Sequence, residues 1–195
     1  MTDVGSVKTP VVTALEEIFS QSGANSNFIG SHPMAGSERS GIAAARADLF
    51  EGSVCVLTPT IFTADAPLSV ARQLWEKVGC HILEMQPEDH DRKIARISHL
   101  PHLAAIAVTL AALRADPAAS RCAGNGFRDV TRIASGNPEL WTGIISQNRA
   151  EILAALQDAH DVAGELLAVI RNGDEHALHR LLHEAQSLRD TAAAG

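Results

Sequence analysis

One short segment of the sequence places a histidine where a ligand could reach it. Residues 27–30 are a predicted strand, and Ser-His-Pro-Met-Ala-Gly follows as the loop 31–36. A loop after a strand is where α/β proteins bind ligands, and a histidine there can act as a general base near neutral pH. His32 is therefore a candidate catalytic residue. The alternative is a turn in which His32 is only a surface or capping residue, and spacing alone favours that alternative.

Two further histidines follow an acidic segment. The sequence reads Glu-Asp-His-Asp at residues 88–91 and Ser-His-Leu-Pro-His at residues 98–102. On a helix His99 and His102, three apart, would share one face. No cysteine or third ligand has a spacing suited to zinc, so a metal is the weaker option and histidines satisfied within the helix are the alternative. A stripe along the last predicted helix is assigned to a partly exposed polar face rather than to a metal site: His176, His179 and His183.

A glycine-bordered segment at residues 124–136 could bind an anion. Its two first glycines would let the backbone approach a ligand closely. Arg128 and Arg132, four residues apart, could form a clamp on carboxylates. The alternative, which spacing alone favours, is that the two arginines pair with Asp129 and Glu139.

Composition and charge exclude several classes of protein. The chain has 195 residues, of which 46% are hydrophobic and 20% charged, as in a chain that buries a core. The net charge of -7 argues against broad attraction to nucleic acid or to an anionic membrane. The apolar run 103–113 is too short to span a bilayer, and no secretory signal follows Met1. Three scattered cysteines are typical of reduced thiols, so we expect a cytoplasmic protein: Cys55, Cys80 and Cys122.

The elements that must position these residues change in kind near Pro87. Residues 1–86 alternate short strands with amphipathic helices, which predicts βαβ units and a parallel or mixed sheet. The pattern predicts helices at residues 11–19, 43–50 and 67–78 and strands at residues 27–30, 54–57 and 80–85.

Residues 87–195 are predicted to be all-α. Residues 87–113 read as one long helix bent at Pro101. Residues 138–171 and 174–193 carry a helical periodicity, and Asn-Gly separates them. The last two helices have more apolar surface than one small domain covers, so we expect a homodimer through these C-terminal helices.

Four segments, in order along the chain, resemble the signature of the prephenate/arogenate dehydrogenases of tyrosine biosynthesis. The first is Asp-Val-Gly-Ser-Val-Lys at residues 3–8, and the second is the histidine loop 31–36. The others are Ser-His-Leu-Pro-His at residues 98–102 and Gly-Phe-Arg-Asp-Val-Thr-Arg-Ile-Ala at residues 126–134. The resemblance covers essentially the whole chain.

The resemblance implies a fold and a reaction. Members have a Rossmann-type domain that binds NAD or NADP, followed by a helical domain that dimerises. They oxidise prephenate at C4 with loss of carbon dioxide and give 4-hydroxyphenylpyruvate; some take arogenate and give tyrosine. The fold class expected here is α/β followed by all-α, with residues 1–86 as a partial Rossmann-like layer and residues 87–195 as the helical substrate-binding and dimerisation domain.

The resemblance also implies roles for single residues. His32 would accept the proton of the substrate's C4 hydroxyl, and Ser6 would orient His32 and that oxygen. Ser6 and Pro33 would also contact the cofactor, and Arg132 would hold a substrate carboxylate. His32 and Arg132 must then share one cavity. The other substrate-site residues implied are His102, Gly126, Arg128, Trp141 as an apolar wall, and Glu38 and Asp129 at the entrance.

This sequence departs from the family pattern in two places. Asn125 stands where the family usually has a glycine, and no GxGxxG run, which holds the pyrophosphate at a helix N-terminus, occurs in the chain. We therefore expect residues 1–86 to be the C-terminal remnant of a nucleotide-binding domain, and the isolated chain to show little prephenate-dependent reduction of NAD(P)+. The alternative function is a non-catalytic, dimerising protein that binds prephenate or tyrosine.

Overall fold

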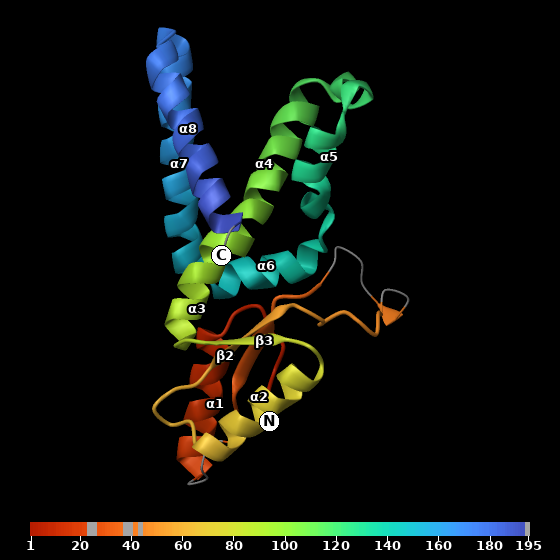
Figure 1. The fold of residues 1–195 in the computed structure, drawn as a ribbon, viewed down its shortest axis with the longest axis vertical. Helices are drawn as coiled ribbons and strands as arrows, with labels where there is room; N and C mark the ends of the chain where they lie inside the picture. The colour runs from red at the N-terminus through yellow and green to blue at the C-terminus, as the bar shows by residue number, and fades with distance from the viewer. Residues whose placement is uncertain (23–26, 37–40, 43–44, 194–195) are drawn as a thin grey trace. The chain divides into compact units, whose positions relative to one another are not determined.

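The computed structural model describes residues 1–22, 27–36, 41–42 and 45–193 (Figure 1). The chain divides into two compact units, Met1–Ile152 and Leu153–Gly195. The α/β layer followed by helices agrees with the predicted fold class. The predicted domain boundary at residue 86 falls within the first unit and stays a prediction.

A small mixed sheet lies at the centre of the α/β layer. Its strands are β1 (Gly30–Pro33), β2 (Val54–Thr58) and β3 (His81–Glu84), in the order β1-β2-β3. β1 pairs antiparallel with β2, and β2 pairs parallel with β3. The predicted mixed sheet is thus present. The first strand begins three residues later than predicted, because Gly30 to Pro33 pair with β2, and His32 therefore lies on the strand and not in the loop after it.

Two helices accompany the sheet, α1 (Thr9–Ser22) and α2 (Asp65–Lys77). Ala71 and Trp75 of α2 are buried in the core of the α/β layer. Gly79, with φ +94, ends the α2 region in the left-handed backbone conformation that glycine tolerates best. The core comprises Ile29, Cys55, Leu57, Ala71, Trp75 and Cys80.

The helix predicted at residues 43–50 is wrong over the part that is described. Residues 45–50 form no helix, and residues 43–44 lie outside the described residues. The backbone instead makes turns, in which the N–H of Glu51 donates to the carbonyl of Asp48 and that of Ser53 to the carbonyl of Phe50. The segment is too short to offset the cost of starting a helix without packing on one face.

One long helical rod follows the sheet. It consists of α3 (Pro87–Ile94), a π-helical segment (Ala95–His99) and α4 (Leu100–Ala115). The distortion comes immediately before Pro101 rather than at it. A proline in a helix lacks an N–H and crowds the preceding turn, and the wider π turn relieves that crowding.

The rod is also long and apolar enough to cross a membrane by length and composition alone, with a mean hydropathy of 1.3 over its most apolar stretch. It also carries buried polar side chains, and they contact other parts of the first unit. These are His90, Asp91, His99 and His102.

The segment after the rod is more helical than predicted. Residues 124–136 were expected to be a polar segment bordered by glycines, but they form α5 (Asn125–Thr131) and a 3-10 turn (Arg132–Ser135). Another 3-10 turn precedes them (Pro117–Cys122). The single helix expected over residues 138–171 is two helices, α6 (Pro138–Gln147) and α7 (Arg149–Asn172), because Asn148 ends α6.

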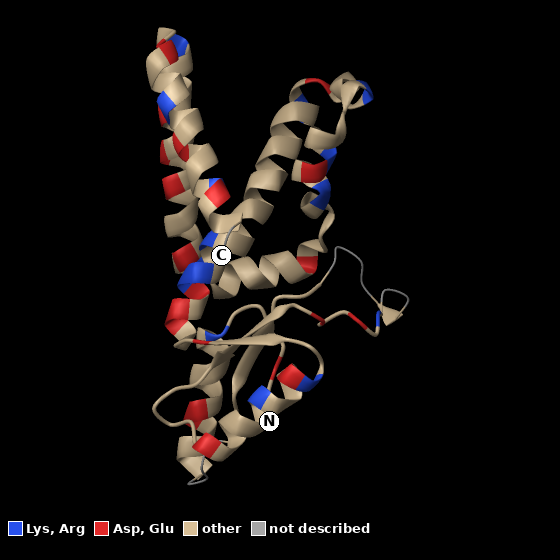
Figure 2. Cartoon of the chain, viewed as in Figure 1, with Lys and Arg blue, Asp and Glu red and all other residues tan. Residues whose placement is uncertain are grey.

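The second unit is a helical hairpin of α7 and α8 (Glu175–Ala193), which run antiparallel (Figure 1). Gly173, with φ +66, makes the turn between them. Acidic and basic residues are interspersed along both helices (Figure 2). Several large apolar side chains nevertheless stay exposed on the single chain: Leu153, Leu156, Leu167, Ile170, Leu182 and Leu188.

Candidate active site

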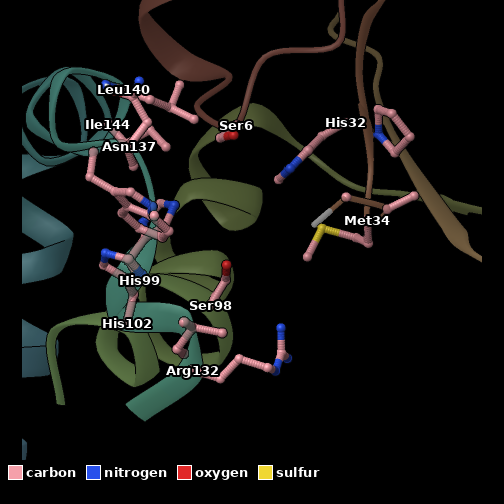
Figure 3. Close-up of a pocket in the computed structure, with 16 residues that line it drawn as sticks. Ser6, His32, Met34, Ser98, His99, His102, Arg132, Asn137, Leu140 and Ile144 are labelled. Atoms are coloured by element: carbon pink, nitrogen blue, oxygen red, sulfur yellow. Dashed lines mark hydrogen bonds between the residues drawn. The ribbon is translucent and has the colours of Figure 1, made fainter. Parts of the chain in front are cut away.

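A pocket of about 410 Å³ lies within the first unit, in the range of about 300–1,000 Å³ that ligand sites occupy. Its walls come from the loop before α1, from β1, from the long helical rod, from the 3-10 turn Arg132–Ser135 and from α6 (Figure 3). Of the residues that the resemblance implies, those that line this pocket are Ser6, His32, Pro33, His102, Arg132 and Trp141.

His32 and Arg132 face each other across this pocket. Figure 3 shows the imidazole and the guanidinium extending into the same open space, with the Ser6 hydroxyl nearby. The two residues are far apart in the sequence, and only the fold brings them together. The structure therefore provides the shared cavity that the resemblance requires.

Other predicted residues lie elsewhere. Gly126, Arg128 and Asp129 are on exposed positions of α5 and do not line the pocket. Of the two arginines of the predicted clamp, only Arg132, at the start of the 3-10 turn after α5, lines this pocket, and the clamp stays a prediction. Glu38 lies outside the described residues.

His32 is buried and neutral. Its side chain is only 8% exposed, and its Nδ1 lies 2.8 Å from Nε2 of His90. Burial lowers the pKa of His32 to about 3, and the neighbouring His90 and Lys8 act in the same direction. A neutral imidazole at the wall of a pocket can accept a proton from a ligand.

The loop that carries Ser6 is tied to the strand that carries His32. The Asp3 carboxylate accepts a hydrogen bond from the backbone N–H of Ser31 at 2.8 Å. The ammonium of Lys8 is fully buried, pairs with Asp3 and donates to the Ser31 carbonyl at 2.8 Å. Burial lowers the pKa of Lys8, while the contact with Asp3 opposes that change. The ion pair of Lys8 and Asp3 thus fixes the loop that carries Ser6 relative to the strand that carries His32.

An aromatic wall closes the side of the pocket opposite His32. The rings of His102 and Trp141 stack with centroids 3.4 Å apart and planes 8° apart. His99 meets the same indole edge-on at 6.0 Å. Gly136 lies against this stack: a Cβ there would come within 2.5 Å of Nε1 of Trp141. The wall therefore needs a residue without a side chain at position 136.

His99 presents a hydrogen-bond donor in the pocket wall. Asn148 donates from its amide to Nδ1 of His99 at 3.3 Å and to the backbone carbonyl of Asp91 at 2.9 Å. This leaves the proton of a neutral His99 on Nε2, and that atom has no partner among the described residues. Burial lowers the pKa of His99 to about 4, so the ring is neutral at pH 7.

Several residues of the site have no predicted role. Four of them line the pocket: Met34, Ser98, Asn137 and Leu140. A fifth, Asn148, positions His99. Ser98 lay inside a quoted motif, but no spacing rule marks Asn148, whose contacts depend on the end of α6. Among the described residues no group of three or more His, Cys, Asp or Glu side chains is arranged to hold a metal ion.

The pocket combines a neutral base, a cation and flat apolar surfaces. Such a set can hold a small anion through Arg132, take a proton at His32 and stack an unsaturated ring against Trp141. Pro33 and Met34 lie beside His32 and add apolar surface. They fit the nicotinamide ring of a dinucleotide, which needs an apolar face next to the reacting atom.

Two family models match the chain. Residues 1–84 match the nucleotide-binding domain of prephenate dehydrogenase, and residues 86–184 match the dimerization domain of prephenate dehydrogenase.

Curated relatives match nearly the whole chain. Prephenate dehydrogenase of Bacillus subtilis is 34% identical over 193 residues, which are 97% of this chain and 51% of the relative. Cyclohexadienyl dehydrogenase of Zymomonas mobilis is 32% identical over 96% of this chain and 64% of its own length. The chain spans about half the length of the first of these relatives.

Solved structures agree. Arogenate dehydrogenase of Synechocystis superposes with a TM-score of 0.82 at 36% identity, covering 98% of this chain and 68% of that one. Prephenate dehydrogenase of Aquifex aeolicus, in complex with hydroxyphenyl propionate and NAD+, superposes with a TM-score of 0.81 at 33% identity, covering 97% and 66%.

Proposed function

The chain belongs to the prephenate dehydrogenase family, and we propose that it serves the oxidative decarboxylation of prephenate to 4-hydroxyphenylpyruvate with NAD+ or NADP+ in tyrosine biosynthesis. Arogenate, which differs from prephenate by an amino group in place of a keto group, is the second substrate to test. The observation that carries the proposal is the shared pocket of His32 and Arg132.

Prephenate is a dianion with a hydroxyl at C4 of its ring. Arg132 binds one carboxylate, and charge-assisted hydrogen bonds give that contact its strength. His32 takes the proton of the C4 hydroxyl on its pocket-facing nitrogen. The ring carboxylate leaves as carbon dioxide, and the electrons of the broken C–C bond complete the aromatic ring. When bound, the nicotinamide supplies the chemistry of hydride acceptance from C4.

The other pocket residues orient the reactants. Ser6 holds the C4 oxygen against His32, and Ser6 with Pro33 contacts the cofactor. Trp141, stacked on His102, offers a flat wall to the cyclohexadiene ring and excludes water on that side. Because aromatisation supplies the driving force, the chain mainly has to position the substrate and deprotonate it.

We place the working protein in the cytoplasm as a homodimer. Residues 1–86 serve the nucleotide and residues 87–195 the substrate and the dimer contact. The exposed leucines of the α7–α8 hairpin support a second copy as the partner, since an apolar surface of this kind is typical of a subunit interface. Sedimentation equilibrium of the full chain measures the assembly directly.

The experiment that tests the function measures prephenate binding by calorimetry in the wild type and in Arg132→Gln. Loss of a charged hydrogen bond costs about 1.5–3 kcal/mol, so we expect the affinity to fall by roughly 10- to 150-fold. The matched control is Arg121→Gln, on an exposed position outside the pocket, which should bind like the wild type. Equal affinity in both variants would remove Arg132 from the site.

Turnover is followed in the same samples through reduction of NAD+ or NADP+, with prephenate and then with arogenate. Binding that depends on Arg132 together with substrate-dependent reduction supports the enzyme. Because the chain carries no GxGxxG run, little reduction is expected of it alone, so binding without reduction supports the substrate site and leaves the alternative of a non-catalytic prephenate-binding protein standing. No binding of either substrate contradicts the proposal.

A further inference from the structure

Three buried side chains form a line that starts at the pocket and ends in the protein interior. Nδ1 of His32 lies 2.8 Å from Nε2 of His90, and Nδ1 of His90 lies 2.8 Å from Oδ1 of Asp91. His90 is completely buried and Asp91 is 4% exposed. His32 belongs to β1 and the other two to α3, so the line joins the sheet to the helical rod.

Asp91 is anchored where α1 begins. Its Oδ1 accepts a hydrogen bond from the backbone N–H of Lys8 at 2.8 Å, and its Oδ2 accepts one from the backbone N–H of Thr9 at 2.9 Å. Burial alone would raise the pKa of Asp91, but hydrogen bonds from His90, Thr9 and Lys8 outweigh it and lower that pKa. The carboxylate is therefore ionised at neutral pH and acts only as an acceptor.

The Asp91 carboxylate determines which atom donates and which accepts in each hydrogen bond of this line. Because Asp91 can only accept, the proton between it and His90 sits on Nδ1 of His90. A neutral His90 then has its lone pair on Nε2 and accepts a hydrogen bond from Nδ1–H of His32. That leaves the lone pair of His32 on Nε2, the nitrogen that is free to face the pocket.

We propose that His90, held by Asp91, is a positioning residue that fixes His32 in the Nδ1–H tautomer and so directs its basic Nε2 at the bound substrate. The inference rests on the proposed function for the identity of that substrate, but the tautomer is a property of the chain alone. His32 in the other tautomer would present an N–H to the C4 hydroxyl and could not take its proton.

The same line stabilises His32 after it has gained a proton. The proton moves from the C4 oxygen to Nε2 of His32, and the Nδ1–H bond to the neutral His90 becomes charge-assisted and stronger. The charged groups around His32 act on its protonated form in opposite directions. Lys8, His90 and His99 disfavour a positive charge on His32, while Asp3 favours it. Asp91, at the far end of the line, also carries a compensating negative charge.

The first test reads the tautomer directly in the full chain without any reaction. Histidine ¹⁵N–¹H correlation spectra of the ¹⁵N-labelled protein at slightly alkaline pH distinguish a protonated Nδ1 from a protonated Nε2. We expect His32 and His90 both to be neutral and protonated on Nδ1. A His32 protonated on Nε2, with a charged His90 donating to it, would overturn the proposal whether or not the chain turns over prephenate.

The second test compares two substitutions of His90. His90→Gln keeps an amide oxygen that can accept from Nδ1–H of His32, whereas His90→Leu removes the acceptor. We expect His90→Leu to change the His32 tautomer in the spectra and, under conditions where the wild type turns over, to lower kcat at least tenfold with little change in KM. His90→Gln should retain the tautomer and most of the kcat. Equal losses in the two variants, or an unchanged tautomer in His90→Leu, would contradict a positioning role.

The chain supplies a matched control pair. His160 also precedes an aspartate, and its Nδ1 lies 3.4 Å from Oδ1 of Asp161, but both side chains are largely exposed. His160→Gln and His160→Leu should leave kcat, KM and the His32 spectrum unchanged. If the chain binds no prephenate, the proposed function fails on its own, and the spectra of the wild type and the His90 variants still decide the inference about the tautomer.

Discussion

Gly136→Ala tests the close packing of the aromatic wall. Gly136 has φ −59 and ψ 154, a backbone conformation that alanine adopts freely, so the substitution strains nothing in the main chain. Its effect comes from space alone. The new Cβ would lie 2.5 Å from Nε1 and 2.9 Å from Cδ1 of Trp141, and 3.0 Å from Cε1 of His102, where ordinary contacts begin at 3.4 Å. The stack of the two rings must therefore shift.

The size of the effect follows from two opposing contributions. Overpacking a filled site typically costs about 1–3 kcal/mol. Replacing glycine by alanine also restricts the unfolded chain, which stabilises the folded state by about 0.4–1 kcal/mol. We expect a net loss of about 1–2 kcal/mol in the free energy of unfolding, and weaker prephenate binding, because the displaced Trp141 moves into the pocket.

Urea unfolding followed by circular dichroism measures the stability, and calorimetry measures the binding. The matched control is Gly143→Ala on α6, where an added Cβ meets nothing within 4 Å. That variant should be more stable than the wild type by about 0.5–1 kcal/mol, since alanine favours a helix interior. If Gly136→Ala matched this gain and bound prephenate normally, the close contact between Gly136 and the ring stack would be refuted.

Two further predictions concern the buried ionisable groups. The pKa values of His32 and His99 are lowered by burial to about 3 and about 4 from 6.5. The unfolded state therefore binds protons that the folded state does not, and the free energy of unfolding should fall as the pH drops from about 6.5 towards 4. The loss is up to about 1.4 kcal/mol per pH unit for each histidine, and urea midpoints that stay constant over this range would contradict it. Lys8→Met leaves Asp3 without its buried partner, and because Asp3 is partly exposed the loss of stability should lie toward the lower end of about 3–5 kcal/mol. Arg46→Met, which breaks the exposed pair with Asp48, should cost at most about 1 kcal/mol; similar values for the two variants would refute the buried Lys8 contact.

Local patterns in the sequence predicted much of the α/β layer. The apolar run of β2 and the proline and glycine that mark the predicted helix 67–78 reflect physical rules that act within a few residues. The observed α2 begins at Asp65, two residues earlier. The prediction of a glycine-bordered polar segment at residues 124–136 was wrong, because Asn-Gly and the neighbouring glycines favour turns locally. In the structure, packing of α5 against α4 outweighs that local preference. The break between α6 and α7 at Asn148 also could not be predicted from the sequence. The helical periodicity continues through this position, and the side chain of Asn148 contacts the rod, which is distant in the sequence.

The site was predictable where motifs marked it and not where it depended on distant contacts. The resemblance implied one shared site for five residues, which no spacing rule predicts. All five line the pocket: Ser6, His32, His102, Arg132 and Trp141. The partnership of His32 with His90 joins residues 58 positions apart on different elements. His90 lies inside an acidic motif whose local pattern indicates a weak metal site or histidines satisfied within the helix, so its contact with His32 follows from the fold alone.

The π turn at Ala95–His99 makes the rod tolerant of a change in length at one place. Each residue added to or removed from an α-helix rotates everything beyond it by about 100°. A π turn takes up about one residue more than an α turn, so deleting one residue between 95 and 97 would let the rod close as an ordinary α-helix with His102 still facing the pocket. Deleting one residue between 91 and 94, where the rod is α-helical, has no such slack and would rotate His102 away from the face that carries His90. Two deletions of equal size and similar composition should therefore differ sharply in their effect on the site.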